Sequence, residues 1–146
     1  MAITSAICNS FKQEILEAEH NFTASTGNTF NLALYDSDAT LGAGTTAYTT
    51  SEEITNTSGT AYTAKGKALT SVTPTLDSST AVCDFADVSW TSASFTARGC
   101  LIFYDSHSTD AAVCAIDFGG DKTATSGTFT IQFPAAAAST AIIRIA

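Results

Sequence analysis

The feature that most constrains the fold is a series of short apolar runs, separated by turn-forming residues, that fills the chain from residue 67 onward. The runs cover residues 67–73, 81–85, 95–104, 111–118, 128–133 and 140–145, and turn residues occupy 76–79, 105–110 and 119–127. An earlier run at 29–35 alternates Phe30, Leu32 and Leu34 with Asn31 and Ala33, which is typical of a half-buried strand. No helical periodicity separates the runs after residue 20. The pattern predicts a mainly β fold, an antiparallel β-sandwich or jelly-roll-like domain.

One helical pattern precedes the strands. Ile3, Ile7, Phe11 and Ile15 recur at every fourth position with polar residues opposite them, which predicts an amphipathic helix over about residues 3–18. This apolar stripe either packs on the sandwich of its own chain or forms an interface with a neighbouring subunit. The periodicity alone does not decide between the two.

The composition favours one β-rich domain and restricts the partners. A length of 146 residues suits a single core, so we expect one domain over 1–146, with the helix at about 3–18 and the sandwich at about 29–146. Only 14% of the residues are charged and the net charge is −8. Six scattered Lys and Arg residues are too few to neutralise phosphates, so we expect neither a nucleic-acid partner nor an anionic membrane surface.

The segment between Asp36 and Lys67 is rich in Thr, Ser and Gly. Leu41, Tyr48, Ile54 and Tyr62 are its main apolar anchors. Tyrosines spaced among glycines are typical of loop corners held against a core, so we expect an extended excursion with short strands or turns in preference to a disordered linker.

The four cysteines are widely spaced and have no histidine partners at metal-ligand spacing. In a chain that stays in the cytoplasm we expect free thiols packed as small apolar groups. A disulfide from Cys83 to Cys100 or to Cys114 is the alternative.

Arg98 stands inside an otherwise apolar strand, which raises the question whether it serves chemistry or architecture. We expect a structural ion pair, with Asp84, Asp87 and Asp117 as the candidate partners. The residues around it do not assemble a nucleophile and a base, and we expect no catalytic, cofactor-binding or metal-binding residues. Asp36 and Asp38 fit an Asx turn better than a calcium loop because no distal glutamate follows at the required spacing.

Trp90 is the only tryptophan of the chain. It fits a core position with its indole N–H bonded at the sandwich edge, and an exposed recognition residue is the alternative.

Several short motifs in fixed order suggest a relationship. They are FKQEILEAEHNF (11–22), NLALYDSDATL (31–41), TAY (46–48), GTAYTAKGKAL (59–69), DFADVSW (84–90), TARG (96–99), IDFG (116–119) and FTIQF (129–133) followed by Pro134. In this order they resemble a group of small virion structural proteins of tailed bacteriophages, over nearly the whole chain. The turn at 59–66 departs from the pattern of that group, because Ala61 and Lys65 stand where it carries glycines.

The resemblance implies a structural part of a virion that is assembled in the cytoplasm of the bacterial host. We expect a non-enzymatic capsid decoration (cement) protein that forms homo-oligomers and contacts the major capsid protein or other virion proteins. A neck or tail component is the alternative within the same class. From another class, a module that binds host glycans could use Trp90, Tyr48 or Tyr62 as a stacking platform. An enzyme that uses Asp84 and Asp87 is the weakest hypothesis, because residues three apart do not face each other across a substrate.

Overall fold

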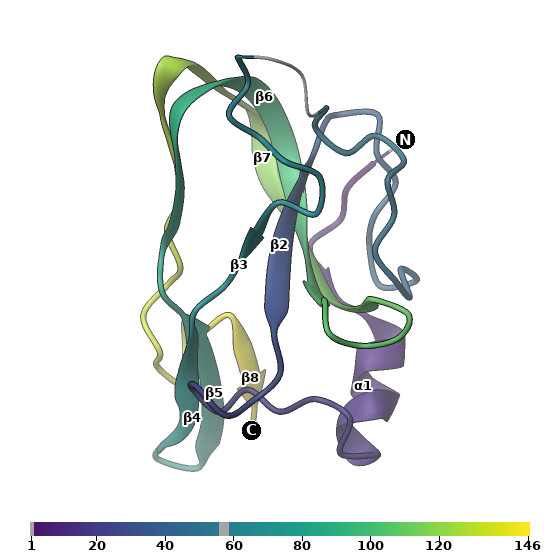
Figure 1. Ribbon diagram of the computed structural model, residues 1–146. Helices are drawn as coiled ribbons and strands as arrows, with labels where there is room; N and C mark the ends of the chain where they lie inside the picture. Colours follow the sequence, from purple (N-terminus) through teal and green to yellow (C-terminus); the bar gives the residue numbers. More distant parts are fainter. Residues whose placement is uncertain (1, 56–58) are drawn as a thin grey trace.

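The computed structural model describes residues 2–55 and 59–146, and in these the chain is mainly β (Figure 1). Two antiparallel sheets lie in a sandwich-like arrangement with one short N-terminal helix, which confirms the predicted fold class. The elements in chain order are β1 (Ala6–Ile7), α1 (Asn9–Leu16), β2 (Phe30–Tyr35), β3 (Lys67–Ala68), β4 (Ser71–Asp77), β5 (Thr80–Phe85), β6 (Val88–Tyr104), β7 (Ala111–Ile131) and β8 (Ile143–Ile145).

The larger sheet has the strand order β1-β7-β6-β2-β3, and the smaller one has the order β4-β5-β8. Strand β2 pairs with β6 without a break, from Phe30 opposite Tyr104 to Tyr35 opposite Gly99. Five of the six residues of β2 are buried, because it lies inside the sheet with both faces covered. The predicted strand at 29–35 is therefore confirmed.

Strands β6 and β7 form a long ribbon that bends over the top of the molecule and descends on the other side (Figure 1). The prediction of two separate strands at 111–118 and 128–133 with a turn at 119–127 is wrong, because β7 runs unbroken from Ala111 to Ile131. Gly119 and its neighbours form an irregularity in the ladder instead of reversing the chain. Turn-forming residues in a long ribbon can produce a bulge and a bend, because the partner strand continues to bond on either side of them.

The N-terminal segment contains less helix than the sequence predicts. Helix α1 begins at Asn9, whereas Ala6 and Ile7 pair with Ala115 and Cys114 at the edge of β7. Before them, Ile3 forms an isolated bridge with Leu41. Hydrogen bonds offered by an open strand edge outweigh helical periodicity over these few residues.

The stripe residues nevertheless face the core of their own chain. Ile3 and Phe11 are buried, and Ile7 and Ile15 are partly buried against the same core. The predicted strand at 67–73 is also corrected, because it divides into β3 and β4 around a short connection, and the strand predicted at 140–145 is shorter than expected.

Aromatic side chains fill the space between the layers. Phe22 stacks on Phe30 with ring centroids 4.3 Å apart, and Phe85 meets both rings edge to face. Towards the bend, Trp90 and Phe95 pack with Tyr62 and Phe129. Trp90 is 1% exposed, so it is a core residue as predicted. Its Nε1 has no hydrogen-bond partner among the described residues, contrary to the expectation of a bonded indole.

Candidate interface surfaces and polar clusters

Arg98 stabilises the irregular part of the β6–β7 ladder. Its Nε donates to Oδ1 of Asp117 at 3.0 Å, and its Nη1 lies 3.7 Å from Oδ1 of Asp121. The ladder places Ala97 opposite Lys122 and Gly99 opposite Asp117, so Arg98 spans a stretch of four residues, 118–121, on β7. The guanidinium therefore ties together the two ends of the bulge, which is an architectural role at a partly exposed position.

Asp117 serves the same local structure. Besides the bond from Arg98, its Oδ1 accepts the backbone N–H of Gly119 at 3.0 Å. The Gly119 N–H, followed by the Arg98 guanidinium, lowers the pKa of the Asp117 carboxyl. The other two candidate partners lie elsewhere, because Asp84 accepts the N–H of Phe85 and Asp87 accepts the N–H of Phe133. Asp84 thus holds the backbone of its own strand, β5, and Asp87 holds the chain just after β7, so the two carboxylates have different backbone partners.

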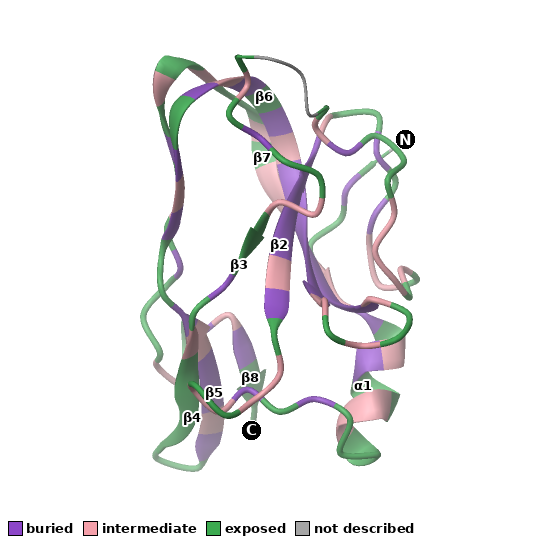
Figure 2. Ribbon diagram, in the orientation of Figure 1, coloured by how far each residue is buried: buried purple, intermediate pink, exposed green. Residues whose placement is uncertain are grey.

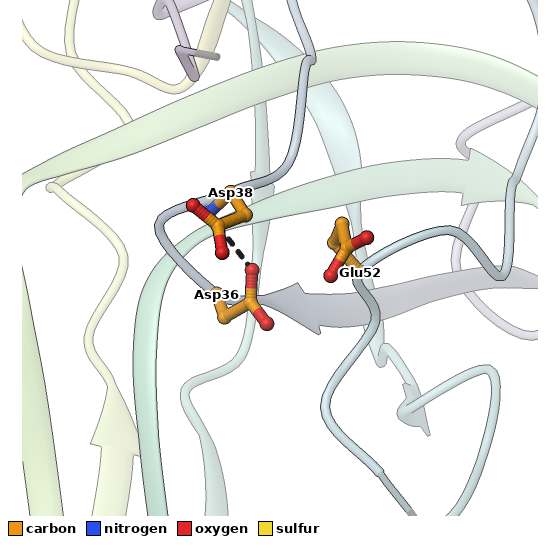
Figure 3. Close-up of side chains that lie close together, drawn as sticks. All are labelled: Asp36, Asp38 and Glu52. Atoms are coloured by element: carbon orange, nitrogen blue, oxygen red, sulfur yellow. Dashed lines mark hydrogen bonds between the residues drawn. The ribbon is translucent and has the colours of Figure 1, made fainter.

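A cluster of three carboxylates lies where β2 ends (Figure 3). Oxygens of Asp36, Asp38 and Glu52 lie within 4.8 Å of one another, and Asp38 and Glu52 are exposed. Oδ1 of Asp36 accepts the N–H of Asp38 at 2.9 Å, which is the predicted Asx turn. Hard cations bind such oxygens, but this turn already accounts for the placement of Asp36.

The buried carboxylate of Glu53 is the main polar centre that the sequence did not reveal. One oxygen accepts the Tyr62 hydroxyl and the Lys65 backbone N–H, each at 2.7 Å, and the other accepts the Tyr48 hydroxyl. The Tyr62 hydroxyl in turn accepts the N–H of Leu34 at 2.9 Å. Burial, aided by Glu53, raises the pKa of Tyr62. Two tyrosines flanking an acidic residue were the available signal, since a buried phenol needs a partner.

The side chain of Lys65 connects the same excursion to the turn after β6. Its Nζ lies 3.0 Å from Asp105 and 2.8 Å from Asp110, and it sits above the rings of Tyr48 and Phe103. In its described parts the 36–67 excursion is held against the core by its tyrosines, as predicted; residues 56–58 lie outside the described chain.

Two residues other than glycine have positive φ in the turn at 59–66. Ala61 has φ 63° and Lys65 has φ 68°, so both adopt the left-handed conformation that glycine tolerates best. Gly66 has no substitute, because an added Cβ would lie 1.8 Å from the carbonyl oxygen of Leu32.

All four cysteines are buried free thiols, as expected, and the alternative disulfides do not form. Burial raises the pKa of Cys8 to about 11 and that of Cys83 to about 12. The same cause raises the pKa of Cys100 and Cys114. Such thiols are packing groups and poor nucleophiles at neutral pH.

A large apolar groove opens beside the second half of β7. Its volume is about 650 Å³, and Ile116, Phe118, Phe129, Ile131 and Phe133 line much of it. Along the outer edge of β7, β1 is the pairing strand in the described chain, and it reaches only Cys114 and Ala115. The edge beyond the bulge therefore has no partner strand, and the groove lies at its side. We name this surface, from Ile116 to Pro134, the β7 groove.

A second uncovered apolar surface lies at the end of the smaller sheet. Leu76 stands opposite Ala81, which stands opposite Ile145, so the three side chains form one row across β4, β5 and β8. Further along the same face Cys83 pairs with Ile143 in the core. At the end of the row Leu76 is 72% exposed and Ile145 is 55% exposed. The apolar face of this sheet thus extends past the core, and Figure 2 shows β4 exposed along its length. We name this row the hairpin tip.

The aromatic residues suggested for glycan stacking are engaged in the core. Trp90 and Tyr62 are each 1% exposed. Tyr48 is partly covered, stacked on Phe103 at 4.8 Å between centroids, with its hydroxyl on Glu53. None of the three presents a free ring to a sugar.

Comparisons of the chain with protein-family profiles, with curated proteins and with solved structures found no match. Within the described residues, no helix is both long enough and apolar enough to cross a membrane.

Proposed function

We propose that this chain is a non-enzymatic structural protein of a bacteriophage virion, and that it decorates the capsid by stabilising contacts between major capsid subunits. The observation that carries the proposal is the presence of two separate apolar surfaces, the β7 groove and the hairpin tip, that the described chain leaves uncovered. A protein that works by repeated assembly needs more than one such surface. The ordered motifs that resemble small phage virion proteins support the same class.

The polar groups support an architectural role. Arg98 and Asp117 hold a bulge, Glu53 holds two tyrosines, and Lys65 holds a turn. Each of these clusters is occupied by contacts within the chain, and each stabilises irregular backbone. The net charge of −8 favours protein partners over nucleic acid.

The copy number of the protein per virion tests the proposal. We would purify particles of the phage that encodes the chain and measure its ratio to the major capsid protein by quantitative mass spectrometry. A ratio comparable to that of the capsid subunit is expected for a decoration protein. A few copies per particle, enough for one ring, would instead assign it to the neck or tail. Absence from the particle would refute a structural role in the virion.

A further inference from the structure

We propose that two copies of this chain pair along the outer edge of β7, in an antiparallel register centred on Thr130, and so form a two-fold symmetric dimer with one continuous sheet. The contact is a property of the isolated protein. It therefore goes beyond the proposed role in the virion and can be tested in solution.

The outer edge of β7 is open over most of its length. β1 pairs only with Cys114 and Ala115, and the Ser5 hydroxyl accepts the N–H of Asp117. After that point no strand of the described chain pairs with this edge. The outward backbone groups between residues 118 and 131 therefore have no strand partner. Such an edge pairs readily with a strand of another chain, which supplies the missing backbone hydrogen bonds.

Elsewhere the sheet edges of the described chain are short, protected or covered. β1, β3 and β8 have two or three residues each, and β4 contains Pro74, which cannot donate to a ladder. The part of β6 that β2 leaves free bonds to the 36–67 excursion at Ser94 and Ser89. Natural sheets use short strands, prolines and charged residues to prevent edge pairing. The last part of β7 has none of these, because residues 123–131 include neither a charge nor a proline.

Charge favours a second copy at this edge. The chain carries a net charge of −8, so most contacts between copies bring like charges together. Residues 123–143 are the longest stretch without a charged side chain, and the edge lies within it. The cores of protein interfaces are depleted in charged residues. An antiparallel edge also fits its own copy, because a two-fold axis sets each donor of one strand opposite an acceptor of the other.

The side chains select the register. Phe129 and Ile131 stand opposite buried residues of β6, so both lie on the inner, apolar face of β7. Thr130 lies between them on the exposed face, where its hydroxyl bonds to that of a serine on β6 at 2.8 Å. A two-fold axis at Thr130 places Phe129 of each copy opposite Ile131 of the other. It also places Thr130 opposite its own counterpart. Aromatic–β-branched and Thr–Thr pairs are favourable cross-strand neighbours.

The position of the β7 groove supports an added strand at this place. Residues 128–132 all line the groove, although successive side chains of a strand point to opposite faces. The groove therefore lies beside the edge and not over one face of the sheet. A strand added along the edge covers Ile131, which is only partly buried in the described chain.

The first test uses the full chain with single added cysteines. The four native thiols are buried, so an added surface cysteine is the one that oxidises readily. Opposite residues of an antiparallel pair have Cβ atoms about 4.5–5.5 Å apart, and diagonal neighbours are about 7–8 Å apart, which is too far for a disulfide. Thr130→Cys is therefore expected to give a disulfide-linked dimer under mild oxidation. Thr128→Cys alone is not, whereas its equimolar mixture with Gln132→Cys is. Thr75→Cys, on the exposed strand β4, is the matched control.

A second test reverses charge at the same axis and needs no oxidation. Light scattering after size-exclusion chromatography is expected to show a dimer for the wild-type protein. Thr130→Lys and Thr130→Glu each set like charges opposite one another, and each is expected to raise the dissociation constant roughly fivefold. An equimolar mixture of the two variants sets opposite charges at the axis, so it is expected to form a heterodimer. Thr75→Lys is the matched control and should leave the mass unchanged.

Three results would overturn the proposal. They are a wild-type protein that stays monomeric at about 100 μM, where a contact of even modest affinity is populated, cross-linking of Thr130→Cys no faster than that of Thr75→Cys, and a mixture of the charged variants that associates no better than either one alone. Circular dichroism confirms that each variant is folded. The virion copy number is measured separately, so a failure of this contact is distinguishable from a failure of the proposed function.

Discussion

Replacement of Glu53 by alanine should destabilise the protein more than any other change to its polar clusters. The carboxylate accepts the hydroxyls of Tyr48 and Tyr62 and the N–H of Lys65, and it is 9% exposed. Without it, the Tyr62 hydroxyl and the Lys65 N–H lose their partner in a site that water reaches poorly. The Tyr48 hydroxyl lies closer to the surface and can bond to water.

The magnitude follows from the two donors that remain buried. Each unsatisfied donor costs about 1–3 kcal/mol, so Glu53→Ala should lower the free energy of unfolding by roughly 2–6 kcal/mol. For a chain of this size 1 kcal/mol corresponds to about 3–4 °C in Tm, so a decrease on the order of 10 °C is expected. Glu53→Gln keeps the volume and one acceptor but turns an NH₂ group towards other donors, so its effect should be intermediate.

Urea unfolding followed by the fluorescence of Trp90 gives the free energy, and thermal unfolding followed by circular dichroism gives Tm. Glu52→Ala is the matched control, because it removes an exposed neighbouring carboxylate and should change stability by less than about 0.5 kcal/mol. A Glu53→Ala protein within about 1 kcal/mol of the wild type would refute the reasoning. It would mean that the excursion rearranges and satisfies its donors in another way.

Three further predictions concern the backbone, the thiols and the bulge. Ala61→Gly should raise the free energy of unfolding by about 1 kcal/mol in urea titrations, because glycine relieves the positive φ of an exposed alanine; a loss of stability would contradict the left-handed assignment. Raised folded-state pKa values mean that the protonated thiols and phenols stabilise the fold below their unfolded pKa. The free energy of unfolding should therefore fall as the pH rises above 9. Each thiol contributes a decrease of about 1.4 kcal/mol per pH unit until the pH reaches its folded-state pKa, about 11 for Cys8 and about 12 for Cys83. A flat profile from pH 9 to 11 would contradict burial of the thiols. Arg98→Ala should lower Tm by less than Glu53→Ala, with Arg98→Lys in between, and an unchanged Tm would show that the bulge holds without its guanidinium.

Apolar alternation was sufficient to predict the β class and the central strands. The run at 29–35 and the run at 95–104 became strands that pair with each other, because their side chains must be buried on both faces. The bend of the β6–β7 ribbon could not be predicted in this way. Residues 119–127 carry the Gly, Ser and Thr of a turn, and only the pairing with β6 decides that they continue a strand.

The contacts of the candidate residues also differ in how far the sequence predicts them. Arg98 and Asp117 could be proposed as partners because each stands out in an apolar strand, and the choice among three carboxylates required the register. Glu53 lies in a polar segment, where the sequence gives no reason to distinguish it from the other acidic residues. Its importance depends on Tyr48, which precedes it, and Tyr62, which follows it, because their hydroxyls bond to its carboxylate only in the folded excursion.

The topology explains why the β7 groove stays open. On the inner side of the ribbon, β6 is covered by β2, and the 36–67 excursion adds Tyr62 against Trp90. On the outer side, β1 pairs only with Cys114 and Ala115, and the segment before it reaches Asp117, whose N–H donates to the Ser5 hydroxyl at 2.9 Å. Beyond Asp117 no strand of the described chain pairs with this edge of β7. The apolar residues of β7 beyond that point still face inward because the ladder with β6 fixes their orientation. A longer β1 or polar residues at 116 and 131 would have closed or hidden this surface. With Ile at both positions, this part of β7 leaves partly exposed apolar side chains at the surface.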